Sequence, residues 1–298
     1  MKTEPKLSFK GTLFVDSGAH GLYNEHVRGK SNINKYKWYY SDEFYQYLEK
    51  YALFIKDNFQ IDIFVNVDVI FNPELTWKIQ SYFEKKYNLR PMPIIHFGTS
   101  KKWLKRYMEK GYSYIGIGGL GQGINRNAYI KWADEIFDFI CDRPSRLPKI
   151  KTHGFAMTSH SLMSRYPWYS VDSTSWISYG SYGQVIFPNK KEGKWDYSSN
   201  FNLIRLSVKS SLAFNKICMV NLGDYVIKKL FIEYIEEKGY VLGNSKLEGG
   251  EEVIIEKGLC NDDKLRCDLN ALYFLDFASH QPKWPWAFKQ IQKGGFLL

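Results

Sequence analysis

Long hydrophobic runs are absent from this sequence. No stretch approaches the ~20 apolar residues needed to cross a bilayer, and the first residues lack the apolar core of a signal peptide. Cysteine is scarce, with 4 in 298 residues, and only Cys260 and Cys267 lie near each other. Internal repeats and low-complexity tracts are also missing. These absences exclude a membrane-spanning protein and a disulfide framework, and they predict a cytoplasmic protein with reduced thiols.

Acidic residues are fewer than basic residues in this sequence. The chain has 41 Lys and Arg against 31 Asp and Glu, which gives a net charge of +10. Such an excess favours a polyanionic partner, because Lys and Arg gain free energy when they displace counterions from phosphates. Aromatic residues reach 17%, and part of that excess is suited to stacking on bases. Many basic proteins bind no nucleic acid, so charge alone does not decide the partner.

Two common ligand signatures are missing from the glycine-rich segment 118–123. It does not fit the dinucleotide fingerprint in a βαβ context, and it lacks the lysine of a P-loop, so we reject both. The segment follows a predicted strand at 112–117. Its glycines therefore indicate a loop whose backbone amides are exposed to a ligand.

Three apolar runs with the character of strands lead into aspartates. One run ends directly before Asp16, another before Asp68, and a third before Asp172. Acids that follow parallel strands meet on one rim of an α/β fold, so we predict that the three carboxylates face one pocket. A nucleophile and its partner acid should then lie within about 10 Å of each other. Asp172 has a second interpretation, because Asp before a turn rich in Ser and Thr often caps a helix.

Predicted strands alternate with amphipathic helices along most of the chain. This alternation predicts an α/β fold, specifically a (β/α)₈ TIM-type barrel with a C-terminal helical elaboration. We expect one domain over residues 1–298, with a strand and helix core at 11–235 and an elaboration at 236–298. Expected details are helix starts at Ser41, Pro73, Thr99 or Ser100, and Tyr129, a loop at 189–200, a helix at 203–218 and a hairpin around Gly249 and Gly250.

The segment 34–40 interleaves cations with aromatic residues. It is suited to gripping a nucleic-acid strand through phosphates and stacked bases. Alternatively, its aromatic side chains pack beneath the helix that begins after Ser41. The loop expected after Asp16 carries His20 and His26, for which a surface or structural role competes with a catalytic one.

Four cations lie together in a second basic segment. We predict that they contact nucleic acid and lie at the mouth of the pocket. They are Arg143, Arg146, Lys149 and Lys151.

At four places the sequence resembles the tRNA-guanine transglycosylases. In the order of that family, these are VDSGAH at Asp16, FVNVDV at Asp68, GIGGLGQG at Gly118 and Gly119, and YSVDSTSW at Asp172. The segments HGFAMTS from His153 and YPWYSVDSTSW from Tyr166 look more like the DpdA-type DNA-guanine transglycosylases of phages and bacteria. The resemblance implies exchange of guanine in DNA for a queuosine-like 7-deazaguanine. It also implies the host cytoplasm if the protein is phage-encoded.

The resemblance assigns roles to individual residues. Asp172 would be the nucleophile that holds the deoxyribose covalently, and Asp16 would move the proton as bases leave and enter. Asp68 would accept hydrogen bonds from the donor edge of the purine. The other implied contacts to the base are Ser17, Gly118, Gly119, Leu120, His153, Phe97 and Trp168. The implied partners are DNA and a free base such as 7-cyano-7-deazaguanine.

The chain departs from the tRNA enzymes because it lacks their C-x-C-x2-C…H zinc site. Cys260, Cys267 and His280, with Cys218, are weak candidates for a rearranged zinc site, and the alternative is that the cysteines are buried thiols. Base exchange itself requires no cofactor. Two other functions stay open, a transglycosylase that acts on tRNA and a nucleic-acid-binding barrel without catalysis. A barrel glycoside hydrolase is disfavoured, since no predicted strand ends in Glu.

Overall fold

The computed structural model describes residues 11–31, 35–119, 124–157, 159–209 and 225–289. Its contacts divide the chain into two compact units. The described part of the first unit extends to Phe155 and includes Trp168–Ser170. The second unit comprises Ala156–Pro167 and Val171–Lys289. The single domain expected from the sequence stays a prediction.

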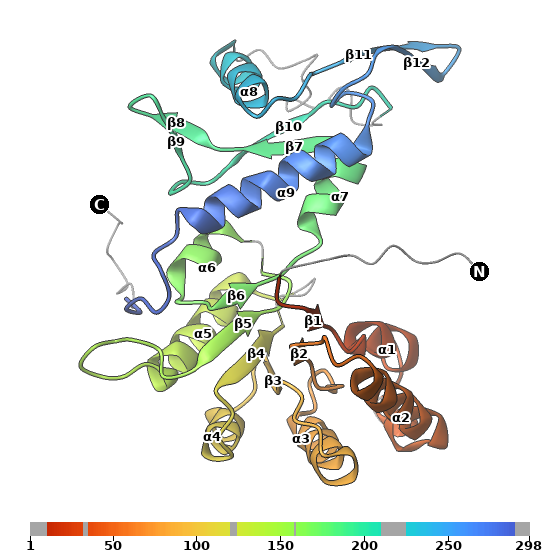
Figure 1. Ribbon diagram of the computed structural model, residues 1–298, viewed down its shortest axis with the longest axis vertical. Helices are drawn as coiled ribbons and strands as arrows, with labels where there is room; N and C mark the ends of the chain where they lie inside the picture. The colour runs from red at the N-terminus through yellow and green to blue at the C-terminus, as the bar shows by residue number, and fades with distance from the viewer. Residues whose placement is uncertain (1–10, 32–34, 120–123, 158, 210–224, 290–298) are drawn as a thin grey trace. The chain divides into compact units, whose positions relative to one another are not determined.

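The first unit alternates short strands with helices (Figure 1). In chain order its elements are β1 (Phe14–Val15), α1 (Ala19–His26), the 3₁₀ helix η1 (Lys37–Tyr40), α2 (Asp42–Asp57), β2 (Ile63–Phe64), α3 (Pro73–Tyr82), the π-helix η2 (Phe83–Tyr87), β3 (Ile94–His96), α4 (Lys101–Glu109), β4 (Tyr114–Gly118), α5 (Arg126–Ile140), β5 (Lys151–Gly154) and the first residue of β6 (Ser170–Val171).

Neighbouring strands of the first unit follow one another in sequence. Strand β1 pairs with β2 in parallel, and Val65 forms a parallel bridge to Met92, just before β3. A four-stranded sheet continues in the order β3-β4-β5-β6, with β3, β4 and β5 parallel. Parallel neighbours joined by helices are the repeating unit of α/β barrels.

The strands of the first unit curve strongly. The rings of Phe14 in β1 and His153 in β5 stack with centroids 4.7 Å apart. In a flat sheet, four steps of about 4.8 Å would separate these strands by about 19 Å. Side chains from successive strands also meet in one cluster around Val65, Met92 and Ile94. A barrel requires such curvature, but the described residues show no closed ring of strands, so the eight-stranded barrel stays a prediction.

Local sequence determines where the helices of the first unit begin. The Ser41 hydroxyl accepts a hydrogen bond from the Phe44 amide and starts α2. Pro73 is the first residue of α3, behind the Asn72 cap, and Ser100 caps α4. These three starts were expected and are confirmed. Helix α1 replaces the loop expected after Asp16.

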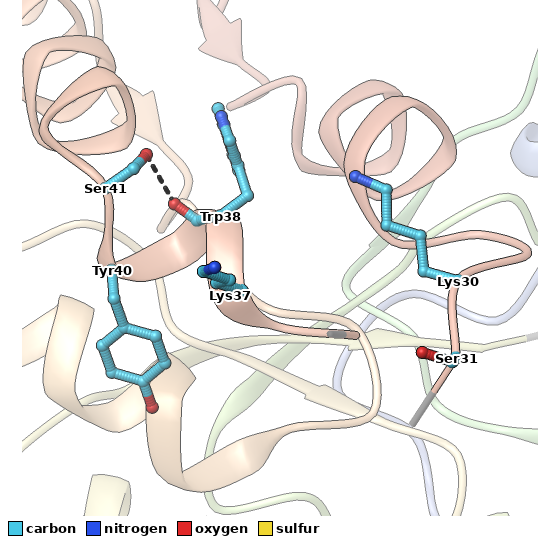
Figure 2. A pocket seen from close by; sticks show the side chains of 6 residues that line it. All are labelled: Lys30, Ser31, Lys37, Trp38, Tyr40 and Ser41. Atoms are coloured by element: carbon cyan, nitrogen blue, oxygen red, sulfur yellow. Dashed lines mark hydrogen bonds between the residues drawn. The ribbon is translucent and has the colours of Figure 1, made fainter. Parts of the chain in front are cut away.

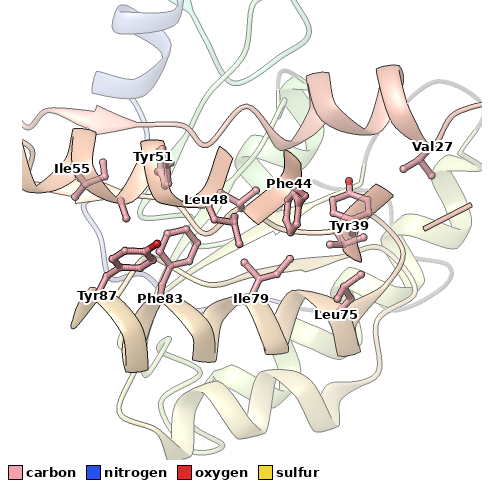
Figure 3. Close-up of a cluster of buried hydrophobic side chains, with 13 residues drawn as sticks. Val27, Tyr39, Phe44, Leu48, Tyr51, Ile55, Leu75, Ile79, Phe83 and Tyr87 are labelled. Carbon is pink, nitrogen blue, oxygen red and sulfur yellow. The ribbon is translucent and has the colours of Figure 1, made fainter. Parts of the chain in front are cut away.

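The main core of the first unit described here lies between α2 and the helical segment formed by α3 and η2 (Figure 3). Its buried members recur at helical spacing: Phe44, Leu48, Tyr51 and Ile55 on one side, and Leu75, Ile79, Phe83 and Tyr87 on the other. Tyr39 joins this core, with its ring 4.9 Å from that of Phe44. The interpretation that aromatic residues of 34–40 pack beneath the next helix is therefore correct for Tyr39.

The second unit is built from helices and antiparallel hairpins. Its elements are Val171 of β6, α6 (His160–Arg165), α7 (Ser175–Ser181), β7 (Gln184–Phe187), β8 (Asn189–Lys191), β9 (Lys194–Asp196), β10 (Asn202–Arg205), α8 (Tyr225–Glu237), β11 (Asn244–Glu248), β12 (Glu251–Glu256) and α9 (Asp263–Ser279). Strand β7 pairs with β10, β8 with β9, and β11 with β12, all antiparallel. Across the described residues of both units, every helix is too short or too polar to cross a bilayer.

Two expectations for the second unit are wrong. The loop expected at 189–200 contains the β8–β9 hairpin, whose turn places Glu192 and Gly193 at positive φ (51° and 76°). The helix expected from residue 203 begins instead as β10, because Leu203 and Ile204 pair with β7. Tertiary pairing here overrides the local helical pattern, and residues 210–218 lie outside the described ranges. The hairpin at 249–250 is confirmed.

The core between α2 and α3 yields a stability prediction. Leu48→Ala should lower the free energy of unfolding by about 2–5 kcal/mol, because the side chain is fully buried and leaves a cavity. Leu53→Ala on the same helix is the control: this leucine is 50% exposed, and its cost should stay near 0.5 kcal/mol. Urea unfolding of both variants measures the difference. Equal costs would show that this interface does not stabilise the first unit.

Candidate active site

Asp16 lies directly after β1, with an exposed side chain. One of its carboxylate oxygens accepts a hydrogen bond of 2.7 Å from the Ser17 amide. Tyr47 of α2 donates its hydroxyl to the Ser17 carbonyl oxygen over 2.6 Å. Burial, and then the charge of Asp16, raise the pKa of Tyr47. Helix α2 thus holds the turn that presents Asp16.

Asp68 and His96 form a buried pair at the ends of neighbouring strands. The Asp68 side chain is 4% exposed and that of His96 is 13% exposed. Nε2 of His96 makes a short hydrogen bond with Oδ2 of Asp68. Asp68 follows the Val65 bridge and His96 ends β3, so the parallel register brings them together. Asp68 was expected at this rim, whereas His96 was not assigned a role from the sequence. The available signal was a His at the end of an apolar run.

Gly118, the last residue of β4, and Gly119, directly after it, allow two strand ends to approach. A Cβ on Gly118 would lie 3.0 Å from Nδ1 of His96, so the missing side chain leaves room for the imidazole. Gly119 has a φ of 111°, and a Cβ there would lie 2.7 Å from the Phe97 amide nitrogen. Close packing therefore explains both glycines. Contacts from their amides to a base stay a prediction, and Leu120 lies outside the described residues.

Two buried hydroxyls near the acids have no hydrogen-bond partner within the described part of the chain. They belong to Tyr39, which is 1% exposed, and to Ser17, which is 2% exposed. Burial, and then the charge of Asp68, raise the pKa of Tyr39. Ser17 directly follows Asp16. Because buried polar groups are nearly always hydrogen-bonded, both hydroxyls mark positions where a ligand or water could supply a partner. Ser17 was expected near the base, but Tyr39 was not.

His153 lies inside the curve of the sheet. Its ring is 4% exposed and stacks on Phe14. Nδ1 lies 2.6 Å from the Ser170 hydroxyl oxygen, which lies 2.5 Å from the Tyr114 hydroxyl oxygen. These contacts give His153 a place in a buried polar layer that links β4, β5 and β6. Its predicted contact with a base stays a prediction.

The two aromatic rings expected to stack on a base both pack against α5. Trp168 is 4% exposed and packs edge-on against Phe137 of α5, with centroids 4.9 Å apart. Phe97 is partly buried and packs against Tyr129 and Trp132 of the same helix. The packing favours a core role for both rings.

The basic segment before β5 lies at the other end of the strands. Its four cations precede or begin β5, and so lie toward the amino end of that strand, whereas Asp68 and His96 lie at carboxyl ends. Arg146 pairs with Asp138 over 2.8 Å, and the Lys151 ammonium lies 4.0 Å from the Tyr169 ring centre. The expected position of Arg143, Arg146, Lys149 and Lys151 at the mouth of a pocket stays a prediction, although within the first unit their segment leads into the amino end of β5. Contact of the segment with nucleic acid stays a prediction.

In the second unit, Asp172 follows Val171 directly and its side chain is exposed. Its Oδ1 accepts a hydrogen bond of 2.7 Å from the Ala156 amide, and its carbonyl oxygen accepts one of 2.8 Å from Met157. Ala156 has a φ of 52°, a left-handed conformation that is uncommon for alanine. Helix α7 has Thr174 as its N-cap, so the Asp172 side chain fixes a backbone turn and does not cap that helix.

Asp172 borders a pocket of about 360 Å³ within the second unit. The lining is mostly apolar: Met157, Met163, Val171, Asp172, Ser173, Trp176, Ala271, Phe274 and Leu275. Ligand pockets are typically concave, apolar and supplied with few polar groups. This pocket therefore offers one carboxylate beside a surface suited to a flat ring or a sugar.

The candidate zinc ligands contribute to packing in the second unit. Cys267 of α9 packs tightly against Gly180 of α7. The His280 ring stacks on Tyr197 with centroids 4.6 Å apart, and its Nδ1 lies 2.8 Å from the Asp276 carbonyl oxygen. In the ranges that the structure describes, no three His, Cys, Asp or Glu side chains are grouped to hold a metal ion. Cys260 is partly buried, and Cys218 lies outside those ranges.

No protein-family model, curated protein or solved structure matches this chain in the comparisons with known proteins. Fold and site geometry alone define its class, a mixed α/β protein with acids after three of its strands.

The Asp68–His96 pair yields a prediction about stability. His96→Ala removes the donor from a buried carboxylate and should lower the free energy of unfolding by about 1–3 kcal/mol. His96→Gln keeps an N–H donor and should recover part of this loss. His20→Ala, at an exposed position of α1, is the control and should change stability by about 0.5 kcal/mol or less. Urea unfolding checks all three, and equal costs for His96→Ala and His20→Ala would contradict a stabilising pair.

Proposed function

We propose that this protein replaces guanine in DNA by a 7-deazaguanine derivative, with Asp172 as the nucleophile. The observation that carries the proposal is the setting of Asp172. Its exposed carboxylate is held in place by the Ala156 amide on the edge of an apolar pocket of about 360 Å³. The motif resemblance supplies the reaction class, and this setting suits an attack on a sugar carbon.

The first displacement breaks the bond between C1′ of the deoxyribose and N9 of guanine. An Asp172 oxygen attacks C1′, the bonding electron pair leaves with guanine, and Asp16 supplies the proton that neutralises the departing base. The sugar is now held as a glycosyl ester. Retaining glycosidases use the same logic, in which a carboxylate forms a covalent intermediate.

The second displacement restores the free carboxylate. N9 of the incoming 7-deazaguanine attacks C1′ on the face that guanine left, and its proton passes to Asp16. One base leaves and one enters, so protons and electrons balance without a cofactor. The ester must be kept from water until the second base attacks, and the apolar side chains beside Asp172 offer few groups that would hold a hydrolytic water molecule.

Base selection is assigned to Asp68. A buried carboxylate accepts hydrogen bonds from the N–H groups of a purine edge. It discriminates strongly against a base that lacks these groups, because the buried carboxylate would then be left without a partner. The bond from His96 supports this role, since it fixes the orientation of the carboxylate. The buried hydroxyls of Tyr39 and Ser17 are further candidates for contact with the base.

Asp172→Asn tests the nucleophile. The variant keeps the shape of the side chain but loses the anion, so exchange should fall to background while DNA affinity persists or rises slightly. Nucleoside mass analysis of DNA incubated with 7-cyano-7-deazaguanine measures exchange, with a tRNA substrate as a second arm. Ser173→Ala, at another position that lines the pocket, is the matched control and should keep most of the activity.

The covalent intermediate can be trapped. Wild-type protein incubated with DNA without incoming base should give a denaturation-resistant adduct, and Asp172→Asn should give none. Normal exchange by the variant would overturn the assignment of Asp172. Wild-type protein that only leaves abasic sites would be a hydrolase, and exchange in tRNA alone would move the substrate to RNA.

Asp68→Asn tests base selection. Asn presents an amide donor where the purine edge needs an acceptor, so KM for the incoming base should rise roughly 10- to 100-fold. The kcat at saturating base should fall much less. Asp57→Asn, at an exposed position of α2, serves as the control for a lost negative charge. An unchanged KM for Asp68→Asn would exclude this carboxylate from base recognition.

A further inference from the structure

A second pocket, of about 660 Å³, lies in the first unit (Figure 2). Lys30 and Ser31 lie on the segment after α1, whereas Lys37, Trp38, Tyr40 and Ser41 belong to η1 and the start of α2. Figure 2 shows the two lysine side chains reaching the pocket from these two segments. The lining therefore combines two cations with two aromatic rings.

The pocket is surrounded by a stretch of cations, which Glu25, Asp42 and Glu43 flank. Between Val27 and Ser41 the chain carries Arg28, Lys30, Lys35 and Lys37 and no acidic residue. None of these four cations pairs with an acid in the described part of the protein. Unpaired cations gathered on one surface attract polyanions.

The Lys30–Ser41 surface is defined here as the lining of this pocket: Lys30, Ser31, Lys37, Trp38, Tyr40 and Ser41. Neighbouring residues support its aromatic side chains. Trp38 stacks on His26 with centroids 3.7 Å apart and donates its indole N–H to Glu43 over 2.8 Å. Tyr39 anchors the segment in the core (Figure 3), and the next residue, Tyr40, is 63% exposed. Because the backbone beside Tyr40 is anchored by its neighbours, stacking of a base on the exposed ring costs less conformational freedom than it would on a mobile loop.

The Lys30–Ser41 surface lies at the same end of the strands as the first unit's acids. Helix α2 starts at this surface, and its Tyr47 bonds to the Ser17 carbonyl oxygen directly after β1. Tyr39 is close enough to Asp68 for that charge to affect its pKa. By contrast, the basic segment 143–151 precedes β5 and lies at the opposite end of the strands.

We infer that the Lys30–Ser41 surface binds a single-stranded stretch of DNA. Lys30 and Lys37 contact phosphates, and Tyr40 stacks on an unpaired base. The choice of DNA rests on the proposed function, but binding requires no catalysis. An open surface with separated cations and an exposed ring fits a polymer better than a small anion, which needs converging donors.

Salt-dependent binding tests the phosphate contacts. The probe is a fluorescent single-stranded DNA oligonucleotide, titrated at several salt concentrations without a free base. The double variant Lys30→Ala/Lys37→Ala should bind at least about tenfold more weakly, and its logarithmic salt slope should be smaller by about 1.4, or about 0.7 for each lost contact. The matched control Lys50→Ala/Lys131→Ala removes the same charge at exposed positions of α2 and α5 and should change the slope much less. Equal changes in both variants would overturn the inference.

Tyr40 variants test the stacked base. Tyr40→Ala should weaken binding of the single-stranded probe by about fivefold or more with an unchanged salt slope, whereas Tyr40→Phe should bind like wild type. Duplex DNA of the same sequence should not distinguish them. Thermal unfolding shows whether the variants are folded. Displacement of the probe by inorganic phosphate at constant ionic strength would instead identify a small-anion site and contradict the inference.

Binding and exchange can fail separately. If wild type exchanges bases and Lys30→Ala/Lys37→Ala binds DNA normally, this inference is wrong and the proposed function stands. If wild type binds the probe through these residues but exchanges no base, the proposed function is wrong and the surface stands. A wild-type protein that does not bind the probe contradicts the inference directly.

Discussion

The contact between Phe14 and His153 is the constraint on which the first unit's site depends. These rings belong to the first and fifth strands and stack at 4.7 Å, so the sheet between them must curve. Curvature makes the carboxyl ends of the strands converge. Glycines in β4 make this possible, because a Cβ on Gly116 would collide with the Phe155 ring and one on Gly118 would crowd His96. Large side chains of neighbouring strands occupy the volume that these glycines leave.

Charge in the first unit is divided between the two ends of its strands. Asp16 and Asp68 follow strands, and Lys30 and Lys37, which pair with no acid in the described part of the chain, lie at that same end. The second basic segment precedes β5 and is partly neutralised, since Arg146 pairs with Asp138. A net charge of +10 does not reveal this division. For a polyanionic substrate the division matters, because cations near the acids offset the repulsion between carboxylate and phosphate.

Local signals in the sequence predicted helix starts and strand ends well. Ser41 and Pro73 begin helices for reasons contained within four residues, and aspartates follow strands as expected. The Asp68–His96 pair joins residues 28 apart, so it depends on sheet register that no local pattern contains. The same limit applies to β10, where pairing with β7 overrides a helical pattern. By contrast, the position of segment 143–151 could have been predicted from the sequence, because residues that precede a parallel strand lie at its amino end.

The surroundings of the aspartates suggest why residues of one type would take different roles in the proposed reaction. Asp68 is 3% exposed and pairs with an imidazole, so water cannot replace a missing partner, and a wrong base would leave polar groups unpaired. Asp172 is exposed, accepts a hydrogen bond from the Ala156 amide and lies beside an apolar wall, a setting that suits attack on a sugar carbon in the proposed reaction. In this proposal a buried carboxylate discriminates between bases but cannot reach C1′. An exposed carboxylate can attack C1′ but discriminates little between bases. Exchange without hydrolysis needs both, because the ester must form quickly and then wait for the correct base.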